Sequence, residues 1–317
     1  GVGLSNYWEY DGSFTTPPCT EAVDWRVLQE YATLSSAQLT KFQQAIGWKE
    51  AGGNYRPPQP LMTRKIHGCV LQEWYPYNAE AWATSVKGAN ELCAKGDVQS
   101  PVDLPKCQEA ETREPLGLDW GSKQVKLKNT GYTVQLDVVG SGGIMRFGDV
   151  YYRMLQCHFH TGSEHTIGGE QMPMEVHCVH EKISQSGVSN SYGVLGVFYE
   201  VGSSADPFLE QFEDLLPEAP VDQGDITVSD FKGPVNFDLL PTSTSITEYY
   251  TYRGSLTTPP CSEVVDWYVM VPTVSITEAQ LEKFKSAIGV PSGNFRPPQP
   301  IGSGGPVEGC KETPAAA

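Results

Sequence analysis

The hydrophobic positions of the chain gather in runs that turn residues separate. Residues 142–160, 174–183 and 192–201 are the clearest of these runs, and all three are rich in Val, Tyr and Phe. Such segments are typical of β-strands. The pattern therefore predicts a protein that is mainly β.

Helical spacing is clear at residues 277–289. Thr277 and Gln280 make a capping box at the start, and Gly289 gives the helix a C-terminal stop. The apolar residues between them share one face: Leu281, Phe284 and Ile288. We expect a short helix here.

An internal repeat organises the chain. Three pairs of segments match: 10–25 with 252–267, 37–47 with 279–289, and 53–60 with 293–300. The first pair reads YDGSFTTPPCTEAVDW and YRGSLTTPPCSEVVDW. A match of this length indicates a duplication, and it predicts one helix in each copy.

The duplication is incomplete, because residues 73–251 have no earlier counterpart. We therefore expect the chain to hold the C-terminal portion of a preceding repeat and then a whole repeat. The predicted parts are the preceding portion at 1–60, a linker at 61–72, a complete domain at 73–301 and a flexible tail rich in Gly, Pro and Ala at 302–317.

Charge narrows the range of partners. The 317 residues include 22 basic and 38 acidic ones, which gives a formal net charge of −16. So acidic a surface repels phosphate backbones, and we expect no nucleic-acid partner. The acidity has two interpretations, simple solubility or life in high salt, where a carboxylate-rich surface keeps its hydration.

No apolar run approaches the roughly 20 residues that span a bilayer, so no transmembrane segment is expected. The chain begins at Gly1, with neither an initiator methionine nor a secretory signal. This beginning fits a fragment or a processed product.

Cysteine usage points to an oxidising compartment. The chain has eight cysteines and no CxxC pair, which disfavours a cysteine-based zinc site. Disulfides are the better explanation, so we expect an extracellular or cell-surface protein. The cysteines are Cys19, Cys69, Cys93, Cys107, Cys157, Cys178, Cys261 and Cys310.

Five of the six histidines lie between residues 158 and 180. His158 and His160 are two residues apart in a strand-like run, so both point to one face. If this run pairs antiparallel with the run that holds His177, with His158 opposite His177, three imidazoles converge. Three histidines with an open fourth position are the pattern of a catalytic zinc site, so Zn²⁺ is the expected cofactor.

Neighbouring residues strengthen this interpretation. Glu175 is placed to accept the second ring proton of His177, and Gln156 is placed near His158, as partners that orient zinc-bound imidazoles commonly are. We interpret His165 and His180 as hydrogen-bonded core residues, with His180 facing away from His177.

Three motifs together resemble the α-carbonic anhydrases: HFHTGSEHT, MEVHCVH and GSLTTPPCSEVVDW, in that order. AKGDVQSPVDL and NTGYTVQL extend the resemblance, which covers about residues 73–301. The repeat and the acidity are most similar to the internally duplicated, salt-tolerant extracellular carbonic anhydrases of unicellular green algae. The resemblance implies an α+β, mainly β fold, with a large twisted, mostly antiparallel central sheet and short peripheral helices.

The resemblance also implies the activity, which is reversible hydration of CO2 to bicarbonate and a proton by zinc-bound hydroxide in an apolar pocket. Thr257 would accept a hydrogen bond from the hydroxide and donate to Glu164, and Thr258 would help to hold bicarbonate. Sulfonamides or anions would inhibit at the zinc. The implied pocket wall, for which plain core packing is the alternative, is Val179, Val194, Leu256, Val265 and Trp267.

Further roles follow from the resemblance. Tyr132 stands where fast members carry a proton-shuttling histidine, and tyrosine relays protons poorly at neutral pH, which predicts slower turnover. Cys93 and Cys261 match the disulfide of extracellular members. The strand pairing that joins His158 to His177 makes a disulfide between Cys157 and Cys178 a further hypothesis.

Residues 1–60 carry a second gating motif at Thr15 but no histidine. They form a loosely attached remnant, complete a missing half from another molecule in a dimer, or replace 252–301 in a segment swap. We favour Thr257 as the gate because it is joined directly to the histidine domain.

The rival functions are a non-catalytic carbonic anhydrase-related binding module and an ester hydrolase. Such binding modules typically lack a zinc histidine, which this chain retains. No HExxH motif supports a zinc peptidase.

Overall fold

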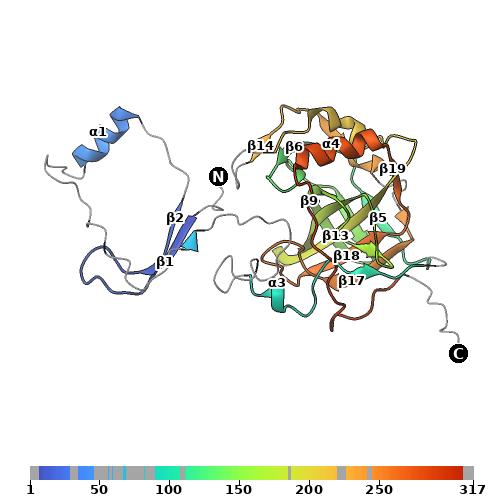
Figure 1. The fold of residues 1–317 in the computed structure, drawn as a ribbon, viewed down its shortest axis with the longest axis horizontal. Helices are drawn as coiled ribbons and strands as arrows, with labels where there is room; N and C mark the ends of the chain where they lie inside the picture. The colour runs from blue at the N-terminus through green and yellow to red at the C-terminus, as the bar shows by residue number, and fades with distance from the viewer. Residues whose placement is uncertain are drawn as a thin grey trace. The chain divides into compact units, whose positions relative to one another are not determined.

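The chain folds as two units, Gly1–Gln72 and Glu73–Ala317 (Figure 1). The computed structural model describes residues 7–28, 35–45, 56, 59, 67–68, 82, 90–107, 111–184, 187–219, 226–240 and 245–309. Cys69 and Cys310 lie outside these ranges. No helix in the described ranges is long and apolar enough to cross a membrane.

The smaller unit is built on a hairpin. Strands β1 (Tyr7–Gly12) and β2 (Val23–Leu28) pair antiparallel, and β3 (His67–Gly68) pairs with β1. The helix predicted for the first repeat is α1 (Ser36–Ala45). The Trp25 indole donates to the Ser13 carbonyl at 2.9 Å, which ties the loop between β1 and β2 to the second strand.

The larger unit consists mostly of strands. In chain order they are β4 (Asp103–Leu104), β5 (Leu116–Asp119), β6 (Ser122–Asn129), β7 (Val134–Val138), β8 (Ile144–Phe147), β9 (Val150–Thr161), β10 (Thr166–Ile167), β11 (Glu170–Gln171), β12 (Met174–Ser184), β13 (Gly187–Val201), β14 (Thr227–Val228), β15 (Pro234–Asn236), β16 (Ser245–Ile246), β17 (Tyr249–Gly254), β18 (Val265–Met270) and β19 (Val274–Ile276). Within the described residues, the helices with defined bounds are α3 (Leu92–Lys95) and α4 (Glu278–Ile288), with 3₁₀ turns η1 (Leu209–Gln211), η2 (Glu213–Leu215) and η3 (Phe237–Leu239).

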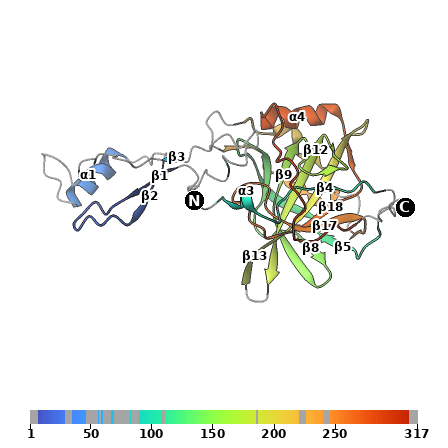
Figure 2. The same ribbon diagram turned by 60° about the horizontal axis from the view of Figure 1, so that its bottom comes forward.

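One sheet of 13 strands dominates this unit (Figure 2). Its main path runs β14-β6-β7-β9-β12-β13-β18-β17. Most neighbours are antiparallel, but β13 pairs parallel with β18 and β19. The predicted α+β, mainly β fold with a large, mostly antiparallel sheet and short peripheral helices is confirmed.

Helix α4 covers one face of this sheet. Thr277 and Gln280 form the predicted capping box, and Gly289 ends the helix in the left-handed region with φ 71°. The Phe284 ring packs on Phe159 of β9, with ring centroids 4.7 Å apart. The helix therefore seals the main core, while the other face of β9 is left for the histidines.

The first part of the predicted tail is held in place. The backbones of Thr251 and Glu308 bond to each other in both directions at 3.0 Å. The Glu308 carboxylate pairs with Arg113, and Ser303 bonds to Asp97. Residues 302–309 therefore belong to the larger unit.

The two copies of the repeat share local structure but not burial. The backbone amide of Cys19 donates a hydrogen bond to the Thr16 carbonyl, and the amide of Cys261 donates one to the Thr258 carbonyl, both at 2.9 Å. The helix positions differ, since Phe42 is 67% exposed in α1 whereas its counterpart Phe284 is 0% exposed. The local sequence thus shapes the loop in both segments, whereas among the described residues the surface that covers such a helix is found in the larger unit.

This contrast predicts unequal effects of one substitution at two matched positions. Phe284→Ala should lower the free energy of unfolding of the larger unit by about 3–5 kcal/mol, because it removes a buried ring and leaves a cavity. Phe42→Ala, the matched control in α1, should change the free energy of unfolding of the smaller unit by less than about 0.5 kcal/mol. Urea unfolding followed by tryptophan fluorescence measures both, and equal losses would contradict the assignment of burial.

Candidate metal centre

The pairing of β9 with β12 brings the predicted histidines together. The antiparallel register sets His158 opposite His177 and His160 opposite Glu175. His158 and His160 are two residues apart in β9, so both project from one face. The ring centroids of His160 and His177 lie 4.6 Å apart, and that of His158 lies 5.0 Å from His160 and 5.3 Å from His177.

Each of these imidazoles has one nitrogen engaged by the protein. Nδ1 of His158 bonds to Oε1 of Gln156 at 2.9 Å, and Nε2 of His177 bonds to Oε1 of Glu175 at 2.8 Å. The structure thus brings both expected orienting residues to their ligands. Nδ1 of His160 donates to the Asn294 carbonyl at 2.7 Å.

Sequence reasoning missed Asn294. Its side chain also accepts from the Thr161 amide at 2.8 Å and donates to the Tyr132 carbonyl at 2.7 Å. Asn294 lies in the repeated segment GNFRPPQP, so the repeat was the available signal. Nothing in that signal indicated that the partner is a histidine on β9.

The remaining nitrogens suit a metal. The ligand atoms of His158, His160 and His177 all lie within 4.8 Å of one another. Nε2 of His160 is buried and has no hydrogen-bond partner among the described residues. A buried polar atom without a partner is costly unless something binds it. Three imidazoles with an open fourth position match the donor set of catalytic Zn²⁺, so these residues fit the metal.

The electrostatics favour neutral imidazoles at His158 and His160. Burial lowers the pKa of His158 well below its usual value, and the nearby His160 and His177 lower it further. Burial also lowers the pKa of His160, despite the adjacent Glu164. At His177 burial lowers the pKa, but the charge and hydrogen bond of Glu175 and the charge of Glu164 outweigh burial and raise it. An unprotonated ring keeps the lone pair that binds a metal.

Glu175 joins several of these groups. Burial raises the pKa of its carboxyl, but the charges of His165 and His177 and their hydrogen bonds outweigh burial and hold that pKa well below its usual value. His165 bonds to Oε1 of Glu175 at 2.8 Å, and its other ring nitrogen lies 2.7 Å from the Tyr252 hydroxyl. His165 is thus the hydrogen-bonded core residue that we predicted, but it shares the partner of His177.

His180 also fulfils its prediction. Its Nδ1 bonds to the Cys178 carbonyl at 2.9 Å, and its ring stacks on Trp120 with centroids 5.5 Å apart. His180 is fully buried outside the three-histidine cluster. It belongs to the core and not to the metal centre.

Glu164 lies beside the cluster with one free oxygen. Its Oε1 accepts from the Arg296 amide at 2.8 Å. Its Oε2 lies 3.6 Å from Nε2 of His160 and 3.7 Å from Nδ1 of His177, and has no hydrogen-bond partner in the described ranges. The expected bond from Thr257 is therefore not among the hydrogen bonds of the described residues, although Thr257 is buried.

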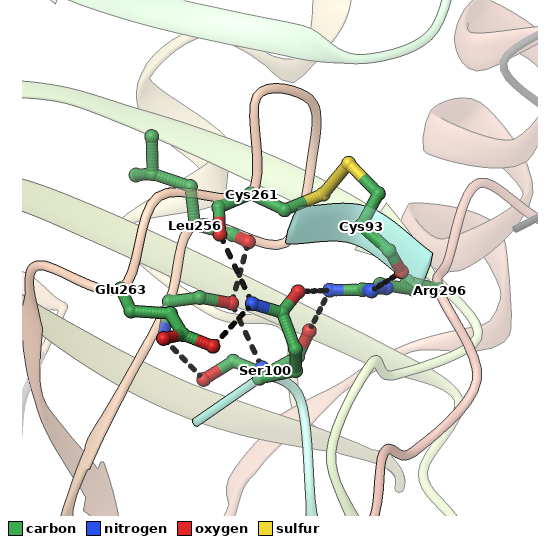
Figure 3. The surroundings of a disulfide bond; sticks show 8 residues. Cys93, Ser100, Leu256, Cys261, Glu263 and Arg296 are labelled. Carbon is green, nitrogen blue, oxygen red and sulfur yellow. Dashed lines mark hydrogen bonds between the residues drawn. A yellow bond between two sulfur atoms is a disulfide. The ribbon is translucent and has the colours of Figure 1, made fainter. Parts of the chain in front are cut away.

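The loop that carries Thr257 spans residues 255–264, between β17 and β18, and is called the gate loop here. The disulfide between Cys93 and Cys261, implied by the resemblance, ties it to α3 (Figure 3). The buried Arg296 donates to the Cys93 carbonyl at 2.7 Å and to Oε1 of Gln99 at 3.0 Å. Gln99 in turn donates to the Cys261 carbonyl at 3.1 Å, so a hydrogen-bond chain braces both ends of the disulfide.

The predicted pocket residues lie together. They belong to one apolar cluster, in which Leu256 is partly buried and the others are buried: Val179, Val194, Leu256, Val265 and Trp267. The Trp267 and His177 rings have centroids 4.8 Å apart, so this cluster borders the metal centre. Thr258 follows in the gate loop and is partly exposed.

Tyr132 lies just before the start of β7. Burial raises the pKa of its hydroxyl, and a hydrogen bond with Thr130 offsets only part of that rise. A hydroxyl with a raised pKa exchanges protons even less readily at neutral pH.

Of the other described cysteines, three are disulfide-bonded and one is free. Cys157 on β9 and Cys178 on β12 form the hypothesised cross-strand disulfide. Cys107 is disulfide-bonded as well, whereas Cys19 is a free thiol.

A large, mostly antiparallel sheet that brings three histidines together, two of them buried and His158 partly buried, is an arrangement that fits catalytic Zn²⁺. Comparison with known proteins gives the family of the chain. The model of the eukaryotic-type carbonic anhydrases matches residues 2–69 and 78–304, and the chain belongs to that family.

Individual relatives agree. The chain is 32% identical over 309 residues to a carbonic anhydrase of Dunaliella salina, covering 88% of this chain but only 52% of the relative. It is 32% identical to alpha carbonic anhydrase 7 of Arabidopsis thaliana, covering 70% of this chain and 77% of that protein. The alpha-carbonic anhydrase of Thermovibrio ammonificans, solved with the inhibitor sulfanilamide, superposes with a TM-score of 0.61 at 32% identity, covering 74% of this chain and 95% of that one.

The role of Glu175 can be tested by its amide. Glu175→Gln removes the negative charge that His177 and His165 share, so zinc affinity should fall by about 10–100-fold. Glu170→Gln, on the exposed strand β11, is the control and should leave affinity unchanged. Competition with a chromogenic chelator measures both, after circular dichroism has shown that each variant is folded. Equal affinities for the two variants would contradict the orienting role.

Proposed function

We propose that this protein catalyses the reversible hydration of CO2 to bicarbonate and a proton, with Zn²⁺ held by His158, His160 and His177. The observation that carries the proposal is the arrangement of these imidazoles. Each bonds to the protein through one nitrogen, and one ring nitrogen from each histidine lies within 4.8 Å of those of the other two. Family membership supports the same activity.

When bound, Zn²⁺ would act as a Lewis acid that lowers the pKa of coordinated water and so supplies a nucleophile at neutral pH. The protein's part is to orient the reactants. Glu164, as a carboxylate, can only accept hydrogen bonds, so a Thr257 hydroxyl that donates to it turns its own lone pairs toward the reacting oxygen. The free Oε2 of Glu164 supports this role, because it is an acceptor still available in the site.

Substrate binding depends on the apolar cluster. CO2 has no net dipole and gains little from polar contacts, so buried Val179, Val194 and Trp267 suit it. Thr258, at the partly exposed side of the gate loop, helps to hold the charged product bicarbonate. Anionic inhibitors and sulfonamides would compete at the same place, which the sulfanilamide complex of the Thermovibrio relative supports.

Proton release is the slow part of the proposed cycle. Tyr132 takes the place of a shuttling histidine, and its raised pKa makes it a poor relay at neutral pH. Turnover should therefore depend on buffer to carry protons away.

The organisation of the whole chain is also proposed. We infer that residues 1–60 are the C-terminal portion of a preceding repeat, joined by 61–72 to the complete domain at 73–301. The exposure of Phe42 and the free thiol of Cys19 support this, because their counterparts Phe284 and Cys261 are buried. The exposure of Phe42 and the free thiol of Cys19 would also support a dimer or a segment swap through residues 1–60. The net charge of −16 supports salt tolerance, and the disulfides support an extracellular location.

The activity is tested by stopped-flow CO2 hydration on protein of measured metal content. We expect one zinc per chain, loss of hydration after chelation, and recovery when Zn²⁺ is returned. As a control, the chelator is removed by dialysis before the assay, so that any loss of hydration reflects the missing zinc. One bound zinc with no hydration activity would instead favour the rival function, a non-catalytic binding module.

Two threonines compete as the gate, and matched variants separate them. Thr257→Ala should lower kcat/KM by about 100-fold or more, because it removes a positioned hydrogen bond in the reacting site. Thr15→Ala should leave kcat/KM within about twofold. Loss in the Thr15→Ala variant alone would mean that residues 1–60 replace 252–301 in the fold.

A further inference from the structure

We propose that the Cys157–Cys178 disulfide is a positioning device for the metal centre, because it fixes the register of β9 against β12 and so keeps His158 opposite His177. This inference depends on the zinc site of the proposed function. It assigns these cysteines a role in metal retention, in addition to any contribution to overall stability.

The disulfide occupies the register position next to the ligands. Cys157 immediately precedes His158 and Cys178 immediately follows His177, and the two pairs are consecutive rungs of the β9–β12 ladder. The cysteine Cα atoms are 4.1 Å apart, the close spacing of a pair that is not hydrogen-bonded in an antiparallel ladder. The covalent bond therefore acts one residue away from both ligands.

The sulfur atoms and the imidazoles project from opposite faces. Successive side chains of a strand alternate, so Cys157 and Cys178 point into the main core, where both are 0% exposed. The bond can restrain the strands without occupying space in the metal centre. Its burial also keeps dissolved reductants away while the protein is folded.

The register of this strand pair decides whether a metal site exists. His160 and His158 share β9, but His177 comes from β12, so two strands must align for three nitrogens to converge. A slip of one residue would turn His177 toward the core face.

The ladder is irregular close to this point. Its register shifts between Val179 and His180, one rung beyond the pair of Cys178 and Cys157. A bulge of this kind interrupts the hydrogen-bonded ladder. The disulfide lies between the bulge and the ligand pair, where it isolates the ligands from the irregularity.

The other disulfide with both partners described provides an internal comparison. Cys93 and Cys261 join α3 to the gate loop across a sequence separation of 168, and neither lies on a ligand strand. Its removal should weaken the structure near Thr257 but leave the β9–β12 register alone. General destabilisation and loss of metal positioning can therefore be distinguished.

The experiment measures the rate at which Zn²⁺ leaves each protein for excess chelator, at a temperature where all variants are folded. C157A/C178A removes the bond and its volume, and C157V/C178V removes the bond but refills the core with residues that suit strands. We expect both to release zinc about tenfold faster than the unaltered protein, or more. The control C93A/C261A should stay within about twofold.

The visible absorption of the Co²⁺-loaded proteins gives a second readout that a purely structural role would not change. The band shape should change in both Cys157/Cys178 variants and not in C93A/C261A. Zinc release and a spectrum like those of the unaltered protein in C157V/C178V would overturn the proposal, because packing alone would then suffice. Equal acceleration in C93A/C261A would overturn it too.

Two further features of the experiment keep the proposal testable. If the double variants do not fold, the release rate is compared for C93A/C107A/C261A, in which the disulfide that involves Cys107 is also removed, refolded with and without reductant, and no difference between them would overturn the proposal. Release rates need no turnover. Unaltered protein that holds zinc but hydrates no CO2 would therefore contradict the proposed function while leaving this test intact.

Discussion

The pairing of β9 with β12 is the interaction on which the rest of the structure depends. Because side chains alternate along a strand, a single register sends His158, His160 and His177 to one face and Phe159, Cys157 and Cys178 to the other. The metal centre and the main core are thus two sides of one ladder. Any change that shifted the ladder would expose apolar residues and disperse the ligands together, so stability of the core also protects the site.

Orientation of the ligands comes from a shell of hydrogen bonds with different origins. Gln156 and Glu175 come from the same two strands as the histidines they hold, but Asn294 reaches His160 from a segment after α4. Glu175 has the largest share, since its Oε2 also accepts from the amides of Glu164 and His165 at 2.9 and 3.0 Å. One buried carboxylate therefore fixes both a ligand ring and the backbone that carries Glu164.

Much of this arrangement could be predicted because its signals are local. The spacing of His158 and His160 and the capping box of α4 are both local patterns, and the structure agrees with each. Asn294 and Arg296 were beyond reach, because their partners His160 and Glu164 lie more than a hundred residues away in sequence. Contacts of that range depend on how the sheet folds, and no local pattern records it.

The two copies of the repeat show where local information stops. The backbone hydrogen bonds of the loop recur around Cys19 and Cys261. Sixteen similar residues therefore suffice to shape the loop. Burial does not recur, since Val27 is 45% exposed and its counterpart Val269 is 0% exposed. Val269 is covered because it packs within the apolar cluster that includes Tyr250 and Trp267. A Thr-Thr-Pro-Pro loop can thus be shaped by its own sequence, whereas the three histidines converge only because two strands of the large sheet pair in one register.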